Sequence, residues 1–457
     1  MHPLETLMKE EIVAVKNSGS FTVKYAITCQ IVTPTHVYGA LFVDSLHLLR
    51  DYMNKFSDVL SITAIFGKGT IVHGILPYAK ELEAYVTLKP LANVPEYVEQ
   101  GNIGPVEYKY KAILYENPQD LIKANNGTSH SEQTSNTEDI GYLQFQLVNP
   151  VQEAIRTKTF GGVIRQSTGL DAIRAILTKY SKLEGVDTSQ QIKGVDVQDG
   201  YSKEINEHIL VPHLSPVIRV PKIIEELVGG IYSTGMQYYL QQSFWYIWSP
   251  YDTTRYGKDD VSMTVFNIPE NKLAQIEKTF RVTNRQLIIL STGAVDFKPI
   301  EEKELPNTPP NVQFVDSRRI LGGFGKVEEN KLKVDGRQNY TAIEDPAIST
   351  HNTNHLAVES EVRITDNYLL EYGEMAKRRG ALLQFTWENS VDNLIYPGMP
   401  LRFIYMKDKI PHQVYGTVIA LDSKFQSESQ GMMQRRFLNK TIVSCFVTDK
   451  LLDPTMQ

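Results

Sequence analysis

Apolar residues near the start of the chain follow the period of two that is typical of β-strands. Runs of alternating or β-branched residues occur at 21–32, 61–66, 70–76, 84–88 and 108–115. Successive side chains on a strand face opposite ways, so these runs predict strands with one or both faces covered. Glycines on either side of Lys68 are expected to close a hairpin between 61–66 and 70–76.

A single helix is expected within this strand-rich region, over 43–57, where apolar residues recur three or four positions apart. The apolar face would consist of Leu46, Leu49, Met53 and Phe56. Asp44 or Ser45 would be its N-cap. The N-terminal region is thus predicted to be a barrel or sandwich with one helix packed against it.

Alternation returns after residue 380 and predicts a second strand-rich region. Ala381, Leu383, Phe385 and Trp387 share one face of a predicted strand over 381–387. Leu401, Phe403 and Tyr405 do the same in the next run, and 414–421 and 441–448 complete at least four strands. Such alternation belongs to a small antiparallel barrel or sandwich.

The middle of the chain mixes helices with strands. Thr168 and Asp171 form a capping-box start for a helix through Tyr180, and Pro221 begins a short helix over 222–228. Strands are expected at 141–148, 261–268 and 286–290. Two further segments lack apolar periodicity: 116–139 is Asn/Ser/Thr-rich and is expected to be a flexible loop, and 301–360 is expected to be an irregular connecting arm.

The stretch 231–256 contains nine aromatic residues in 26 positions. Two aromatic runs flank Gln241, Gln242 and Ser243, which predicts a hairpin. Consecutive aromatic residues must face opposite ways, so both faces of this hairpin should be covered, by a two-sided core or by another subunit. Exposed tryptophans would instead suit glycan binding. The candidate subunit-interface residues are Tyr238, Tyr239, Phe244, Trp245, Tyr246, Trp248 and Tyr251.

Charge and cysteine content narrow the function classes. The formal net charge is −6, from 47 basic and 53 acidic side chains. Tight binding of nucleic acid requires an excess of basic residues on some face of the protein, although a mildly acidic wall would let DNA slide past without sticking.

Cys29 and Cys445 lie in apolar runs and are expected to be buried hydrophobes rather than a disulfide. The N-terminal segment has no secretory h-region, and no stretch approaches the ~18 apolar residues of a membrane helix.

No motif supports catalysis, so we expect neither an enzyme nor a cofactor or metal site. His351 and His355 have a zinc-like spacing, but the intervening Asn-Thr-Asn is poor helix material and no glutamate base accompanies them. The glycine-rich segments 66–70 and 322–326 lack the spacing of a phosphate loop. No Gly-x-Ser-x-Gly elbow is present. A distant carboxylate pair would leave no local signature, so a polysaccharide hydrolase remains the weaker alternative.

Three stretches resemble baseplate hub proteins of contractile-tailed bacteriophages. Residues 21–90 resemble a tail-tube barrel with one inserted helix, and LVGGIYSTGMQYYLQQSFWYIWSPYDTTRY resembles the aromatic hairpin of virion hubs. Ile395-Tyr396-Pro397-Gly398-Met399-Pro400 and the strands after it resemble a second hub barrel, introduced by a Pro-Gly turn.

The resemblance implies an α+β, mainly β fold with two small antiparallel tube-like barrels, an intervening α+β region and a long irregular connection. The expected domains are 1–115 and 361–457 as barrels, 140–300 as the middle region, and 116–139 and 301–360 as loop and arm. It also implies a homotrimeric hub that joins tail-tube and spike proteins in the virion, assembled in the host cytoplasm, with DNA passing through without specific binding. A glycan-binding tail adhesin is the main alternative.

Overall fold

The computed structural model describes residues 3–17, 24–91, 106–115, 140–182, 191–232, 234–258, 261–268, 279–283, 285–299, 313–315, 324–328, 331–333, 380–407, 410–427 and 436–448. The predicted loop at 116–139 and the two histidines His351 and His355 lie outside these residues. Within 301–360, three short strands pair with one another: β16 (Gln313–Val315), β17 (Phe324–Glu328) and β18 (Lys331–Lys333).

Strands dominate the fold and helices are few, which confirms the predicted α+β, mainly β class. The remaining strands are β1 (Lys24–Val32), β2 (Val37–Gly39), β3 (Phe42–Asp51), β4 (Val59–Gly67), β5 (Glu83–Leu91), β6 (Val106–Leu114), β7 (Ile140–Val148), β8 (Thr159–Thr168), β9 (Gly194–Val197), β10 (Ile205–Pro216), β11 (Gln237–Gln241), β12 (Phe244–Trp248), β13 (Ser262–Ile268), β14 (Phe280–Val282), β15 (Gln286–Pro299), β19 (Gly380–Glu388), β20 (Pro400–Lys407), β21 (Ile410–Ser427) and β22 (Phe437–Thr448). The helices are α1 (Pro3–Asn17), α4 (Pro150–Thr157), α5 (Gly169–Ser181) and α6 (Val220–Leu227), with shorter turns η1 (Thr70–Ile75), η2 (Leu76–Tyr78), η4 (Val217–Arg219), η5 (Thr253–Arg255) and η7 (Asp392–Leu394).

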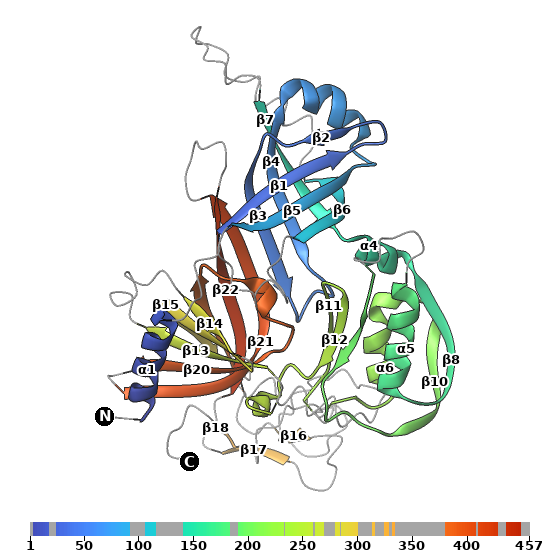
Figure 1. Cartoon of the computed structure of the whole chain (residues 1–457). Coiled ribbons are helices and arrows are strands. Elements are labelled where there is room, and N and C mark those ends of the chain that lie inside the picture. Colours follow the sequence, from blue (N-terminus) through green and yellow to red (C-terminus); the bar gives the residue numbers. More distant parts are fainter. Residues whose placement is uncertain are drawn as a thin grey trace.

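The largest sheet has 14 strands, and its neighbour-to-neighbour pairings close on themselves twice (Figure 1). The first closed path, here called the eight-strand circuit, runs β3, β4, β7, β6, β5, β1, β22, β21 and back to β3. The second, the six-strand circuit, runs β13, β20, β21, β22, β19, β15 and back to β13. The pair β21–β22 therefore belongs to both circuits.

The 18-residue strand β21 passes from one circuit into the other. Its first part, Ile410–Thr417, pairs with β20, whereas Ala420–Gln426 pairs on the same edge with β3. A bulge in the pairing with β22, between Val418 and Ala420, separates the two parts. A bulge bends the strand that carries it. The carbonyl of Ile419 in this bulge accepts a hydrogen bond from the amide of Tyr52 (3.0 Å).

The strands predicted after residue 380 pair with one another antiparallel, as alternation indicated, but the six-strand circuit that they join is mixed. β13 pairs in parallel with both β15 and β20. The chain between β13 and β15 contains β14, which is antiparallel to β15. One intervening strand returns the chain to its original direction, so β15 runs parallel to β13. Local alternation carries no information about such an extra strand.

The predicted helix over 43–57 is wrong, because Phe42–Asp51 is strand β3. A bulge between Val43 and Ser45 shifts the strand's alternation by one residue. Val43 and Leu46 consequently both face the core although they are three positions apart. The spacing that predicted the helix had another origin: of the expected apolar face only Leu46 is buried, Leu49 is half-buried on β3, and Met53 and Phe56 follow the end of the strand.

The predicted strand at 70–76 is also wrong, and with it the hairpin around Lys68. Thr70–Ile75 forms the π-helical turn η1. Ile71 and Ile75 are buried and lie four positions apart, so they share a face of the turn. Here tertiary burial overrides the strand preference of β-branched residues.

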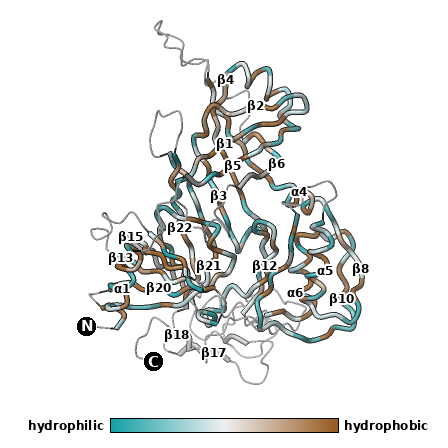
Figure 2. Tube along the Cα trace, viewed as in Figure 1, coloured by the Kyte–Doolittle hydropathy of each residue, from teal (hydrophilic) through white to brown (hydrophobic). Residues whose placement is uncertain are grey.

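A helical module, made of α4, α5 and α6 and wrapped by the two-stranded ribbon β8–β10, lies beside the large sheet (Figure 1). The starts of α5 and α6 were predicted to within two residues, whereas α4 was not predicted. The Thr168 hydroxyl accepts from the Asp171 amide (3.1 Å) and donates to the Asp171 carboxylate (2.7 Å). Pro221 stands in the first turn of α6. Figure 2 shows the hydrophobic residues of this module along α5 and α6, where its core lies.

Helix α1 was not predicted. Met8 and Val15 of this helix pack with Phe266, Ile288 and Ile404 of β13, β15 and β20, so α1 covers one face of the six-strand circuit. Arg281 of β14 donates to Glu11 (2.7 Å) and ties the helix to the sheet. The mixed charged and apolar composition of 3–17 gave only a weak helical signal.

The shared strand offers a direct test of the fold. Leu421 of β21 is fully buried, whereas Ile410 on the same strand is 55% exposed. Leu421→Ala should destabilise the protein by about 2–5 kcal/mol, since it leaves a cavity in the core, while Ile410→Ala should change stability by less than about 1 kcal/mol. Urea unfolding followed by tryptophan fluorescence measures both, and equal effects would contradict the described topology.

A buried carboxyl in the helical module makes stability depend on pH. Burial raises the pKa of Glu225 from 4.5 to about 7, although Lys222 lowers it in part. The pKa of Glu225 is higher in the folded state than in the unfolded state, so protonation of this carboxyl stabilises the fold. This stabilisation is fully present below about pH 4.5 and is lost as the pH rises through about 7. Glu225→Gln should therefore stabilise the protein at pH 8 by a few kcal/mol, with a smaller effect at pH 4. Thermal unfolding at the two pH values tests this, with Glu226→Gln on the exposed side as the control.

Candidate functional site: the aromatic hairpin and its buried polar network

The predicted aromatic hairpin is present. β11 pairs antiparallel with β12, from Gln237 opposite Trp248 to Gln241 opposite Phe244. The turn consists of Gln242, at φ +54°, and Ser243. On its other edge β12 pairs in parallel with β9, so the hairpin becomes a three-stranded sheet.

Both faces of the hairpin are covered by parts of the same chain. Tyr239 and Trp248 are buried in the core of the large sheet. Leu240, Trp245 and Ile247 point the other way and are buried in the core of the helical module. The sequence prediction of two covered faces is therefore confirmed, and in this chain the second cover is its own helical module.

The seven predicted interface residues differ in how much surface they leave for another molecule. Tyr239, Trp245 and Trp248 are buried, and Tyr238, Tyr246 and Tyr251 are half-buried. Phe244 is 37% exposed and retains the most surface among the described members of this set. The interface role stays a prediction, and Phe244 is the residue at which it can be tested.

The aromatic residues also make polar contacts that fix the hairpin in place. The Tyr238 hydroxyl donates to the carbonyl of Ile218 (2.5 Å), and the Trp245 indole donates to Ser181 Oγ (2.8 Å). Tyr251 packs edge-on against Phe446 of β22, with ring centroids 4.9 Å apart. Each contact links the hairpin region to a different neighbour.

The Pro-Gly turn in the resemblance motif packs directly against the hairpin. Gly398 has φ +67°, and a Cβ there would lie 2.1 Å from the Trp248 ring. Only glycine combines this backbone conformation with such a close approach. Arg255 Nη1 donates to the Gly398 carbonyl (2.9 Å). The motif thus holds the connection between β19 and β20 against Trp248.

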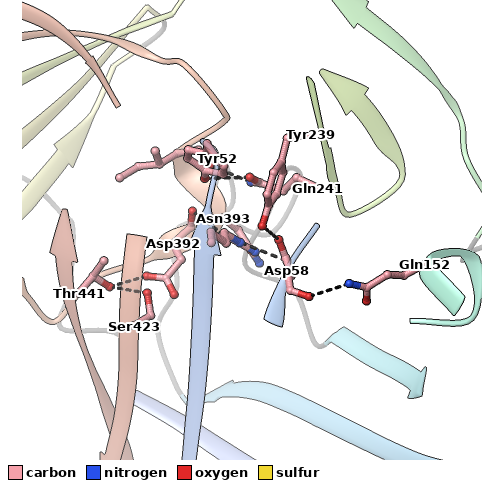
Figure 3. A network of polar contacts seen from close by, with 11 residues as sticks. Tyr52, Asp58, Gln152, Tyr239, Gln241, Asp392, Asn393, Ser423 and Thr441 are labelled. Carbon is pink, nitrogen blue, oxygen red and sulfur yellow. Dashed lines mark hydrogen bonds and ion pairs between the residues drawn. The ribbon is translucent and has the colours of Figure 1, made fainter. Parts of the chain in front are cut away.

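A buried polar network lies at the junction of the sheet, the hairpin and η7 (Figure 3). At its centre Arg50 of β3, only 3% exposed, pairs with Asp58 Oδ2 (3.2 Å). The same guanidinium donates to the Asp392 carbonyl (3.2 Å) and to Asn393 Oδ1 (3.1 Å). One cation therefore joins residues more than 300 positions apart.

The aromatic hairpin is joined to this network by two tyrosines. Tyr239 donates to Asp58 Oδ1 (3.0 Å), and Tyr52 donates to Gln241 Oε1 (2.9 Å). Gln241 in turn donates to the Ile395 carbonyl (2.8 Å). The rings of Tyr52 and Tyr239 meet edge-to-face with centroids 4.8 Å apart.

The network continues through Asp392 into the strand pair shared by both circuits. Asp392 Oδ1 accepts from Asn439 (2.8 Å) and Thr441 (2.7 Å) of β22. The hydroxyls of Thr441 and Ser423 lie 2.9 Å apart and link β22 to β21. In the helical module, Gln152 donates to the Asp58 carbonyl (3.3 Å).

The electrostatics keep the tyrosine hydroxyl of this network protonated and its arginine charged. Burial, and then the Asp58 carboxylate, raises the pKa of Tyr239, so its hydroxyl stays protonated and donates. Burial opposes the charge of Arg50, but Asp58 and its other neighbours outweigh burial and raise its pKa. Burial also raises the pKa of Cys29 to about 12, and both cysteines are buried and free, as predicted.

Within the described ranges, no group of three or more His, Cys, Asp or Glu side chains is arranged to hold a metal ion. The helices in that part of the chain are too short or too polar to cross a membrane.

Sequence reasoning missed this network. Arg50 stood within the expected helix and Asp58 directly after it, and their partners lie near residues 239 and 392. The one available signal was the placement of Arg50 in an apolar run, FVDSLHLLRD. A charged residue at a core position implies buried partners, but not which ones.

Removing the central cation should weaken the junction. Arg50→Gln leaves Asp58 without its buried partner and should lower the free energy of unfolding by about 3–5 kcal/mol. Lys440→Gln breaks a surface ion pair, in which the side chains of Lys440 and Glu388 are 49% and 43% exposed, and should lower it by less than about 1 kcal/mol. Arg50→Lys should fail to restore stability, because one ammonium cannot reproduce the planar set of donors. Denaturant unfolding of the three variants is the measurement, and equal losses at Arg50 and Lys440 would contradict the role of the network.

No protein-family model matches the chain, and no curated protein matches it significantly in sequence. Among solved structures, it is similar to a tail protein from Neisseria meningitidis MC58, with 10% identity and a TM-score of 0.41 over 94% of this chain and 98% of that one. A 43 kDa tail protein of prophage MuSo2 from Shewanella oneidensis gives 8% identity and a TM-score of 0.45 over 94% and 99%. The E. coli c3393 protein, a type VI secretion component similar to T4 tail proteins gp27 and gp5, gives 7% and 0.36 over 93% and 73%.

The structures that this chain resembles are thus phage tail proteins and a related secretion component, the class that the sequence suggested. With TM-scores below 0.5 and identities of 10% or less, these similarities do not by themselves assign a function to the chain.

Proposed function

We propose that this chain is a structural virion protein, a trimeric baseplate hub that joins a tail tube to a spike around a channel for DNA. The observation that carries the proposal is the pair of closed strand circuits sharing β21 and β22. We take these circuits to be the two tube-like barrels. Three chains with two circuits each would supply six similar units, which matches a sixfold tube to a threefold spike.

The described surface offers contacts for such an assembly. Phe244 is partly exposed at the hairpin turn. On the ribbon β8–β10, Val163 and Leu210 stand opposite each other and are 50% and 63% exposed. Within the described residues, the ribbon has no third strand, so backbone groups along its edges are available to pair. Both features suit contacts between subunits.

The mild acidity of the chain supports the channel. With a formal charge of −6, three copies would carry a net negative charge around a passage. Like charges repel phosphates, so DNA would pass without being held. The circuits and the charge together favour conduction over binding.

Glycan binding through the aromatic run is less well supported. That alternative needs Trp245 or Trp248 at the surface, but their exposed fractions are 0% and 2%. A ring that stacks on sugar must present a face to solvent. The described tryptophans of the hairpin instead hold the sheet and the helical module together.

Light scattering at several protein concentrations tests the assembly. We expect a species near three times 51.8 kDa. Phe244→Glu should shift it toward the monomer, because a charge at a buried interface is unfavourable, whereas Tyr115→Glu, at a site 65% exposed, should not. A strict monomer at all concentrations, also in the presence of its tail-tube and spike partners, would overturn the proposal.

A further inference from the structure

A cavity of about 300 Å³ lies between the large sheet and the helical module. Its walls come from the turn between β3 and β4, from α4, from the start of α6 and from β11. Gln152 lines it and also contacts the polar network through Asp58. A concave space of this size, where two parts of a fold meet, is the usual setting for a binding site.

The charged residues that line the cavity are all basic: Lys55, Arg156, Arg219 and Lys222. Arg156 lies over the ring of Phe56, with its guanidinium carbon 5.4 Å from the ring centroid, which holds the cation at the cavity wall. Four cations around one concavity repel one another, so an anion between them would be stabilised.

No Asp or Glu side chain is among the described residues that line the cavity, and the nearby carboxylates have other contacts. Asp58 pairs with Arg50 and accepts from Tyr239. Glu153 of α4 pairs with Lys111. Lys222 acts electrostatically on Glu225, but Glu225 is not part of the cavity lining.

Helix α6 starts beside the cavity, with Arg219 at its N-cap and Lys222 in its first turn. The positive end of its dipole favours an anion in the same place.

We propose that this cavity binds the carboxylates of an acidic segment on a partner protein. Arg156 and Arg219 each offer paired planar donors that fit a carboxylate. A nucleic-acid backbone would need a long basic stripe, whereas this cavity has room for one or two side chains. The inference goes beyond the proposed function and does not depend on the oligomeric state.

Fluorescence anisotropy of a labelled hexaglutamate peptide with the full chain, at low and moderate salt, tests the site. We expect saturable binding that Arg219→Gln/Lys222→Gln weakens at least about tenfold, because two close charge pairs are lost. Lys203→Gln/Lys258→Gln removes the same charge from exposed positions outside the cavity and should leave the affinity within about twofold.

Competition by a dodecathymidylate or by inorganic phosphate distinguishes other anions. Equal weakening by both charge variants, or tight binding of either competitor without peptide binding, would overturn the proposal. A monomeric chain that still binds the peptide through these residues would sustain it even if the hub assignment failed.

Discussion

The backbone pairing of β21 with β22 is the constraint on which the rest of the fold depends. Each strand has two hydrogen-bonding edges. β21 and β22 use one edge to pair with each other, and the free edge of each strand pairs with one neighbour in each circuit. β21 gives one edge first to β20 and then to β3. β22 gives its outer edge to β19 and, at Phe437, to β1. Neither circuit can close without this pair.

The bulge at Ile419 explains how two circuits and a helical module meet at one place. It separates the two parts of β21, and its carbonyl accepts from Tyr52. Tyr52 and Arg50, from adjoining positions of the chain, then contact the hairpin and η7. The aromatic hairpin fills the space between the sheet and the helical module with large rings on both faces. The junction is therefore dense in both apolar and polar contacts.

Elements whose signal is local could be predicted from the sequence. The cap at Thr168, Pro221 and the aromatic hairpin were all located correctly. The strand over 381–387 has Ala381, Leu383, Phe385 and Trp387 on one buried face, as its alternation predicted. The failures have irregular or non-local causes: the helical spacing at 46–56 continued past the end of β3 into the next turn, an extra strand made β13 parallel to β15, and the partners of Arg50 came from distant segments. Periodicity describes a strand's faces, but not its neighbours.

The shared pair also dictates when the fold can be completed during synthesis. The strands β1 to β7 leave the ribosome long before β21 and β22, which lie at 410–448. Until then β3 and β1 each have an edge without its final neighbour. Open strand edges are prone to pair with other chains, and non-local pairing is slow because of the loop entropy that must be overcome. During synthesis, β1 and β3 therefore each keep an incompletely paired edge until β21 and β22 have been made.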